Sequence, residues 1–248
     1  MADRIAAGLL LLVQLAAIGW FLKGDLTRWR PFRGLRDGAG RTRRYWRWCV
    51  KDLLAFALPP LLGLLVLGRL DALVVLPPEF TTAKALLPSL GPAALRTVAI
   101  STALGFAGGT VLVVLVTRLR PSRKPLNMLG QVDRVLPRSP RELGAAAVLS
   151  ISAGVTEELA FRLFLPLTLA LATGSAALAF SLAAVIFGAM HRYQGWVGVI
   201  ATTLVGFALT AVYLVTGRLW VAMACHMTID LNGLVLRPLL TGRWREGR

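Results

Sequence analysis

The sequence predicts an all-α protein, a polytopic bundle of about seven transmembrane helices. Of its 248 residues, 56% are hydrophobic and 16% are charged, whereas a soluble domain has roughly 45–50% apolar and 25% charged residues. The apolar residues gather in runs of about 17 to 25, the length that crosses a bilayer. Because lipid offers no partner to unpaired backbone groups, each run is expected to be helical.

The apolar runs define seven candidate spans. They are Ile5–Leu22, Leu53–Leu76, Thr97–Thr117, Ala145–Leu171, Ser175–His191, Val197–Thr216 and Leu219–Leu236. The first is long for the apolar part of a signal peptide, and its strongest positive charge follows it, so we interpret it as a retained membrane helix. Pro59 and Pro60 are expected to bend the second span, and Pro166 the fourth.

The formal charge of +16 lies mainly between the spans. Basic residues crowd Lys23–Lys51, Arg118–Arg141 and the tail from Arg237 to Arg248. This pattern is typical of the positive-inside rule and of attraction to anionic lipid, rather than of nucleic-acid binding. It predicts a multi-pass protein of the inner (plasma) membrane, with its N-terminus outside and its C-terminus cytoplasmic.

The prolines of the second basic stretch mark a natural boundary in the chain. We predict an N-terminal transmembrane region at 1–143 with three spans, a four-span catalytic core at 144–237, and a basic cytoplasmic tail at 238–248. Of the two cysteines, Cys49 lies in a basic loop and Cys225 inside an apolar run, so we do not expect them to form a disulfide. Cys225 is interpreted as a small apolar filler.

Ionisable residues inside the spans point to a functional site. A charged group at the bilayer centre costs roughly 2.5–3.5 kcal/mol on insertion scales, so such residues are rare. Here Glu157, Glu158, Asp230 and the only two histidines, His191 and His226, all lie within the last four spans. Their concentration predicts a catalytic or ligand-binding site.

The two adjacent glutamates are expected to have different roles. Glu158 and Arg162 are four residues apart, so they share a helix face and can form an ion pair. Glu157 is rotated by about 100° from Glu158 and can point elsewhere. The sequence therefore predicts one paired carboxylate and one that is free for chemistry.

Three segments, EELAFR from Glu157, FGAMH from Phe187 and HMTID from His226, resemble the motifs of one family. In order and spacing they are similar to EExxxR, FxxxH and HxxxN or HxxxD of the CPBP family, the CAAX-protease and bacteriocin-processing (Abi) group. The resemblance covers about residues 144–236 and implies an intramembrane peptidase related to the type II CAAX prenyl endopeptidases. The resemblance implies a membrane-associated peptide or protein as substrate, with a prenylated CAAX-type C-terminus as one implied site of cleavage. The preference for Arg over Lys favours a bacterial source.

Peptide hydrolysis needs an activated water and stabilisation of the tetrahedral intermediate. Our hypothesis makes Glu157 the general base, His191 the residue that helps to hold the water, and His226 with Asp230 the pair facing the oxyanion. Supporting roles fall to Glu158, Arg162 and Phe187. An ionised Asp230 would repel an oxyanion, so it must either be protonated or orient His226 or a metal.

Three alternatives to a metal-free peptidase stay open. Glu157, His191 and His226 are also a plausible ligand set for a catalytic Zn²⁺, although the more specific HExxH signature is absent. Buried acidic residues and histidines also serve transporters and proton relays, and a non-catalytic bacteriocin-immunity protein could keep the motifs for stability. Helix lengths place Glu157 and His191 at one depth but His226 nearer the outer side, unless the last helix begins within the membrane.

Overall fold

The computed structural model describes residues 2–28, 38–119 and 135–242, and every element in them is a helix. In chain order these are α1 (Ala2–Arg28), α2 (Gly38–Asp52), η2 (Leu53–Ala57), α3 (Leu58–Val66), η3 (Leu70–Leu73), η4 (Pro78–Phe80), α4 (Thr81–Lys84), α5 (Pro92–Leu119), α6 (Pro140–Glu158), η6 (Leu159–Phe164), α7 (Leu165–Thr173), α8 (Ala176–Met190), η7 (His191–Gln194), α9 (Trp196–Thr216), α10 (Leu219–Leu231), η8 (Asn232–Leu236) and α11 (Arg237–Thr241).

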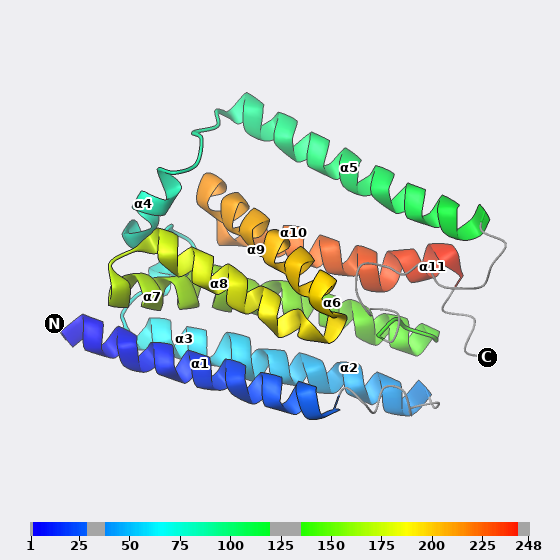
Figure 1. Cartoon of the computed structure of the whole chain (residues 1–248), viewed down its shortest axis with the longest axis horizontal. Coiled ribbons are helices and arrows are strands. Elements are labelled where there is room, and N and C mark those ends of the chain that lie inside the picture. The colour runs from blue at the N-terminus through cyan, green and yellow to red at the C-terminus, as the bar shows by residue number, and fades with distance from the viewer. Residues whose placement is uncertain (1, 29–37, 120–134, 243–248) are drawn as a thin grey trace.

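Long helices run along one common direction, with the two termini at opposite ends of the bundle (Figure 1). Six helices of the described chain are long and apolar enough to cross a membrane. The continuous helix of α6, η6 and α7 is a seventh long segment, and it is buried along most of its length after Thr156. The predicted class, a transmembrane helical bundle of about seven spans, is confirmed.

The second span differs from the prediction, because its helix covers Gly38–Val66 instead of Leu53–Leu76. Most of the second half of the predicted basic loop is therefore helical. Its buried face consists of Arg41, Tyr45, Cys49 and Asp52, which recur at helical spacing and pack α2 against α6. Hydropathy missed this helix because its buried face is largely polar.

A buried ion pair anchors this unexpected helix. The Nε of Arg41 donates to Glu142 over 2.9 Å, and both side chains are only 2% exposed. Arg41 also donates from Nη2 to the carbonyl of Leu136 over 2.8 Å, and the hydroxyl of Tyr45 donates to the carbonyl of Val135. Burying an unpaired charge would raise the free energy of the folded state. The ion pair and hydrogen bonds of Arg41 compensate for this cost, which explains how an arginine can lie in the core.

The segment between the second and third predicted spans contains two short helices, η4 and α4. Phe80 is buried at the end of η4, and its ring lies 4.7 Å from that of Phe180 and 6.2 Å from that of Tyr213. The loop is thereby fixed on α8 and α9 before α5 begins.

Prolines interrupt three of the long helices, each time just after a π-helical stretch. Pro59 and Pro60 follow η2, Pro166 follows η6 and Pro238 follows η8. Proline lacks an N–H and its ring clashes with the carbonyl four residues earlier, so a wider turn before it relieves the clash. At Pro59, Pro60 and Pro166, where the sequence predicts bends, the preceding turn of the helix is π-helical.

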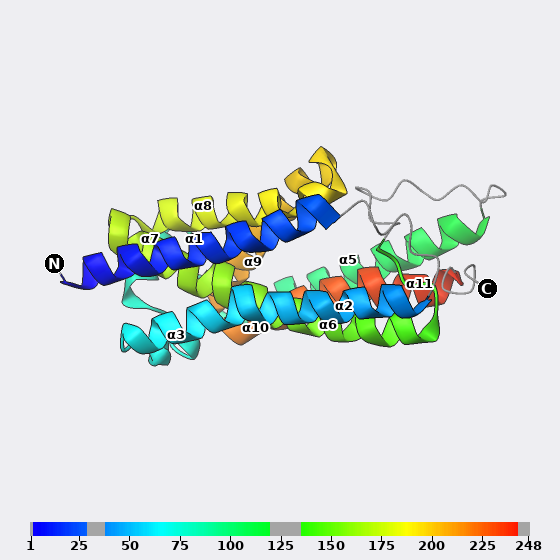
Figure 2. The same cartoon turned by 90° about the horizontal axis from the view of Figure 1, so that it is seen from below.

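The helix ends that flank the basic stretches all lie at one end of the bundle (Figures 1 and 2). The end of α1, the start of α2, the end of α5, the start of α6 and α11 gather there, whereas the N-terminus lies at the other end. Residues 29–37, 120–134 and 243–248 of the basic stretches are outside the described chain. This arrangement agrees with the charge pattern, while the orientation in the membrane stays a prediction.

Candidate active site

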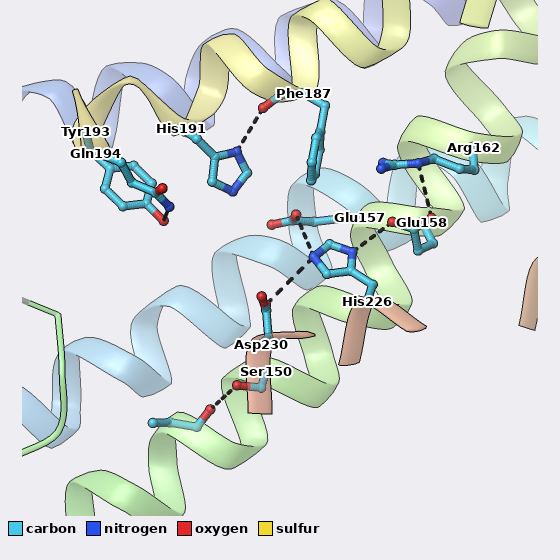
Figure 3. Close-up of polar contacts among 11 residues, drawn as sticks. Ser150, Glu157, Glu158, Arg162, Phe187, His191, Tyr193, Gln194, His226 and Asp230 are labelled. Carbon is cyan, nitrogen blue, oxygen red and sulfur yellow. Dashed lines mark hydrogen bonds and ion pairs between the residues drawn. The ribbon is translucent and has the colours of Figure 1, made fainter. Parts of the chain in front are cut away.

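Helix α6 carries the two adjacent glutamates, and the following π-helical stretch η6 carries Arg162. Glu158 and Arg162 are both fully buried, and the Nε of Arg162 lies 3.2 Å from Oε2 of Glu158. The predicted ion pair between these residues is confirmed. Glu157 points away from this pair into the space beside His226 (Figure 3), as the rotation of 100° per residue predicts.

His226 is held by the second oxygen of Glu158. Helix α10 packs against α6, and Nδ1 of the buried His226 lies 2.8 Å from Oε1 of Glu158. Because a carboxylate oxygen accepts, Nδ1–H is the donor, and this bond orients the imidazole ring. Sequence reasoning paired Glu158 with Arg162 alone and missed this contact, which spans 68 positions and leaves no local spacing signal.

The other ring nitrogen of His226 faces two more carboxylates. Nε2 lies 3.9 Å from Oε2 of Glu157 and 3.8 Å from Oδ2 of Asp230. Both separations exceed hydrogen-bonding distance and are short enough for one water to bridge. The structure thus brings three acidic side chains around one histidine (Figure 3).

His191 reaches the same cavity without touching these groups. Its Nδ1 lies 2.8 Å from the carbonyl of Phe187, so Nδ1–H donates there and Nε2 is left for another partner. The ring of Phe187 is 4.9 Å from that of His191 and 5.8 Å from that of His226, and it carries the guanidinium of Arg162 on its face at 4.4 Å. Phe187 therefore positions both rings. In the described residues no hydrogen bond or ion pair joins His191 to Glu157 or His226.

The position of the α9–α10 turn explains the depth of His226. The α7–α8 turn at Gly174 and the α9–α10 turn at Gly217 both use a glycine with positive φ, 75° and 67°. The Gly217 turn lies further along the bundle, toward the end that holds α11, than the Gly174 turn (Figures 1 and 2). The last helix thus begins deeper than the hairpin of α7 and α8, and His226 comes level with Glu158.

These side chains border one cavity of about 320 Å³. Its lining includes all four proposed catalytic residues, namely Glu157, His191, His226 and Asp230. The wall also contains Phe21, Trp48 and Asp52 of the N-terminal region, which the sequence did not associate with the site. Two polar residues beyond the last motif, Asn232 and Arg237, line it as well.

A metal centre built from these residues is not supported by their arrangement. Two histidines and a carboxylate are suitable donors for Zn²⁺. Among the described residues, however, no three His, Cys, Asp or Glu side chains converge as a set that could hold a metal ion. The candidates Glu157, His191 and His226 face one cavity, and the hydrogen bond at Nδ1 of each histidine leaves its Nε2 as the nitrogen that could bind a ligand.

One family model matches the part of the chain that carries this site. Residues 139–232 match the family described as "Type II CAAX prenyl endopeptidase Rce1-like". The matched segment runs from the cap of α6 to the start of η8 and includes every motif of the site. No curated protein and no solved structure gives a significant match to the chain.

Proposed function

On the premise that residues 139–232 belong to the Rce1-like family of CAAX prenyl endopeptidases, we propose an intramembrane endopeptidase that acts near the prenylated, CAAX-type C-terminus of a membrane-associated substrate. The observation that carries the proposal is the position of Glu157. Its carboxylate opens on the cavity 3.9 Å from Nε2 of His226, whose ring is fixed by Glu158. A water between such groups is placed for deprotonation.

In the proposed reaction, Glu157 and the free Nε2 of His191 hold the attacking water. Glu157 takes a proton as the water oxygen bonds to the scissile carbonyl carbon. His226 acts in this scheme as an imidazolium with both ring nitrogens protonated, so that Nε2–H faces the oxyanion that forms, where a fixed donor in a water-poor site is most effective. When the C–N bond breaks, Glu157 returns the proton to the leaving amine, and the cleaved chain ends in a carboxylic acid.

Asp230 receives a positioning role in this scheme. Its side chain is 30% exposed, unlike that of Glu158 at 0%, and it lies on the same helix as His226 one turn further on. We assign to it the orientation of the His226 ring from the side opposite Glu158.

Cleavage of a farnesylated CAAX-type peptide by the purified protein in detergent tests the proposal. Mass spectrometry would follow the products of the wild type, Glu157→Gln and His191→Ala. Loss of a general base lowers the rate by roughly 10²–10⁴-fold, so Glu157→Gln should be nearly inactive. Cys225→Ala is the matched control, because Cys225 neighbours His226 in sequence but does not line the cavity, and it should keep full activity.

Two results would contradict the proposal. Unchanged cleavage by Glu157→Gln would exclude Glu157 as the base. Flux of substrate into proteoliposomes without any cleavage would instead favour a transporter, the alternative that the buried acidic residues and histidines leave open.

A further inference from the structure

Gln194 presents to the cavity a carboxamide that is only partly hydrogen-bonded. It is the last residue of the 3₁₀-helix η7, and it lines the cavity together with Tyr193. Nε2 of Gln194 donates to the hydroxyl oxygen of Tyr193 over 3.1 Å, and the described residues offer the carboxamide no other hydrogen bond. Its oxygen and its second N–H are therefore available to a group that enters the cavity.

Two glycines determine where this side chain lies. Gly195 has φ 83° and ψ 176°, a backbone conformation that is essentially confined to glycine, and it turns the chain from η7 into α9. Gly198, in the first turn of α9, lies directly against Gln194, because a Cβ at this position would come within 2.3 Å of Cβ and 3.0 Å of Oε1 of Gln194. The missing side chain at Gly198 thus leaves a slot that holds the carboxamide at the cavity wall.

Gln194 lies one turn of the 3₁₀-helix beyond His191. Residues three apart in such a helix eclipse one another, and at about 2.0 Å per residue they are about 6 Å apart along the axis. Figure 3 shows both side chains projecting to the same side of this helix. An extended peptide repeats its orientation every two residues, over about 6.5 Å. A substrate strand along η7 would therefore face Gln194 with a peptide group about two residues from the one beside His191.

A carboxamide is complementary to a peptide group, because its oxygen accepts from an N–H and its N–H donates to a carbonyl. Within a membrane, main-chain groups of a substrate need such partners, since lipid offers none. Asn232 is the other carboxamide of the described cavity wall, but its Oδ1 already accepts from Oγ1 of Thr110 over 3.0 Å. Gln194 is thus the carboxamide with an open acceptor.

We propose that Gln194 binds the main chain of the substrate about two residues from the scissile bond and so holds the peptide extended across the site. The inference rests on the proposed peptidase function and adds a substrate-binding residue to it. Since a carboxamide contacts the main chain, the substrate side chain at that position should matter little to this contact.

Peptides in which one amide N–H at a time is replaced by an ester oxygen test the inference. The replacement moves along both sides of the scissile bond, and kcat/KM is measured for the wild type and for Gln194→Leu. One ester, about two residues from the cleaved bond, should slow the wild type by about 3- to 10-fold, as expected for one neutral hydrogen bond. Gln194→Leu should be slowed by the same factor on the all-amide peptide and no further by that ester, whereas esters elsewhere should affect both proteins equally.

Two further variants sharpen the test. In Gly198→Ala the added methyl group would occupy the slot beside Gln194, so this variant should reproduce the pattern of Gln194→Leu. Arg192→Gln is the matched control within η7. Its guanidinium stacks on the ring of Trp196 at 5.1 Å and does not line the cavity, so the variant should respond to each ester as the wild type does.

A structural role for Gln194 would give a different result. If Gln194→Leu unfolds at a lower temperature and slows all peptides by one factor, with each ester still affecting it as it affects the wild type, Gln194 supports the turn of η7 and the inference is wrong.

Binding measurements separate this inference from the proposed function. If the wild type cleaves the all-amide peptide and every ester peptide equally well, the peptidase function stands and the role of Gln194 falls. If no peptide is cleaved, the affinities of the wild type and Gln194→Leu for the same peptides still decide. A loss of affinity at one ester that only the wild type shows would support the main-chain contact, and equal losses in both proteins would refute it.

Discussion

At the scale of single residues, Glu158 organises the site by using both of its oxygens. One lies 3.2 Å from Nε of Arg162 and the other accepts from Nδ1 of His226 over 2.8 Å. A buried carboxylate with two such partners is held in one orientation, and the histidine is held with it. Glu157, one position earlier, is thereby left to face the cavity.

Asp230→Asn tests the role of the most exposed of these acids. The amide keeps a polar group near Nε2 of His226, now 3.8 Å from the Asp230 carboxylate, and it removes a negative charge near the expected oxyanion. Peptidase activity should therefore stay within about tenfold of the wild type. Asp230→Val, which cannot orient the ring, should lose more, and complete loss in Asp230→Asn would show that the negative charge itself is required.

The sequence predicted those residue contacts that lie within one helix. Glu158 with Arg162 and His226 with Asp230 follow from 3.6 residues per turn, and both pairs are present. The bond between Glu158 and His226 depends on how α6 meets α10, which no spacing along the chain encodes. Arg237 was counted with the basic residues of the C-terminal end and set as the last residue of the predicted core, whereas the helix continues past it through α11.

At the scale of the helices, the crossing of α6 and α10 depends on Gly154. A Cβ at this position would meet the backbone of Met227, with its nitrogen at 2.8 Å and its Cα at 3.0 Å. Backbone atoms of a packed helix cannot yield as the tip of a side chain can. The absence of a side chain at Gly154 thus allows α10 to bring His226, the neighbour of Met227, to Glu158.

Gly154→Ala should force the two helices apart. We expect a loss of about 1–3 kcal/mol in the free energy of unfolding, together with reduced peptidase activity because His226 moves away from Glu158. Thermal unfolding in detergent and peptide cleavage would measure the two effects. Gly144→Ala is the control on the same helix, since its Cβ would meet no atom within 4 Å, and it should leave both properties unchanged or raise stability slightly.

If Gly154→Ala proved as stable and active as Gly144→Ala, the close approach would not control the site. No pattern in the sequence predicted this contact, because a glycine inside a helix looks the same whether it faces lipid or another helix. Prolines were more informative, since their missing N–H acts locally. A bend at Pro166 was expected for that reason. The π-helical turn that precedes Pro166 depends on packing, which the sequence alone does not reveal.

At the scale of the whole molecule, ion pairs tie the ends of the bundle. Arg41 and Glu142 join α2 to α6 at the end that holds α11. Near the other end, Arg69 donates to both oxygens of Glu79, over 2.7 and 2.9 Å. These hydrogen bonds hold the pKa of Glu79 below its ordinary value of 4.5 and fix the loop between α3 and α5.

The Arg69–Glu79 pair predicts a stability difference that depends on pH. A carboxyl whose pKa is lowered by folding stabilises the protein above its unfolded pKa, and this contribution is lost as the pH falls through the folded value. Glu79→Gln should therefore destabilise the protein by about 1 kcal/mol at neutral pH. The difference from the wild type should shrink below about pH 4.

Thermal unfolding of both proteins between neutral and acidic pH would measure this difference. Asp71→Asn is the control, because Asp71 lies 4.0 Å from Nε of Arg69 and its side chain is 64% exposed, so screening by solvent should leave little effect. A difference between Glu79→Gln and the wild type that does not vary with pH would show that the carboxylate charge is not what stabilises the loop.

The number of spans and the gathering of the basic segments were predictable from composition, because hydropathy and charge are summed over many residues. The start of the second helix was not predictable from hydropathy, because the buried face of this segment is largely polar. That face consists of Arg41, Tyr45, Cys49 and Asp52. The depth of the last helix depended on where the Gly217 turn falls within the bundle, which is a property of packing.

Phe21, Trp48 and Asp52 lie in the cavity wall. The segment that resembles the family therefore does not enclose the cavity on its own. Family resemblance begins at residue 139, yet the chamber around Glu157 is closed by helices that precede it. A fragment that starts at this boundary would retain every motif and would expose the proposed catalytic groups to lipid on one flank. In such a protein the N-terminal helices can diverge in sequence only while they preserve the shape of that wall.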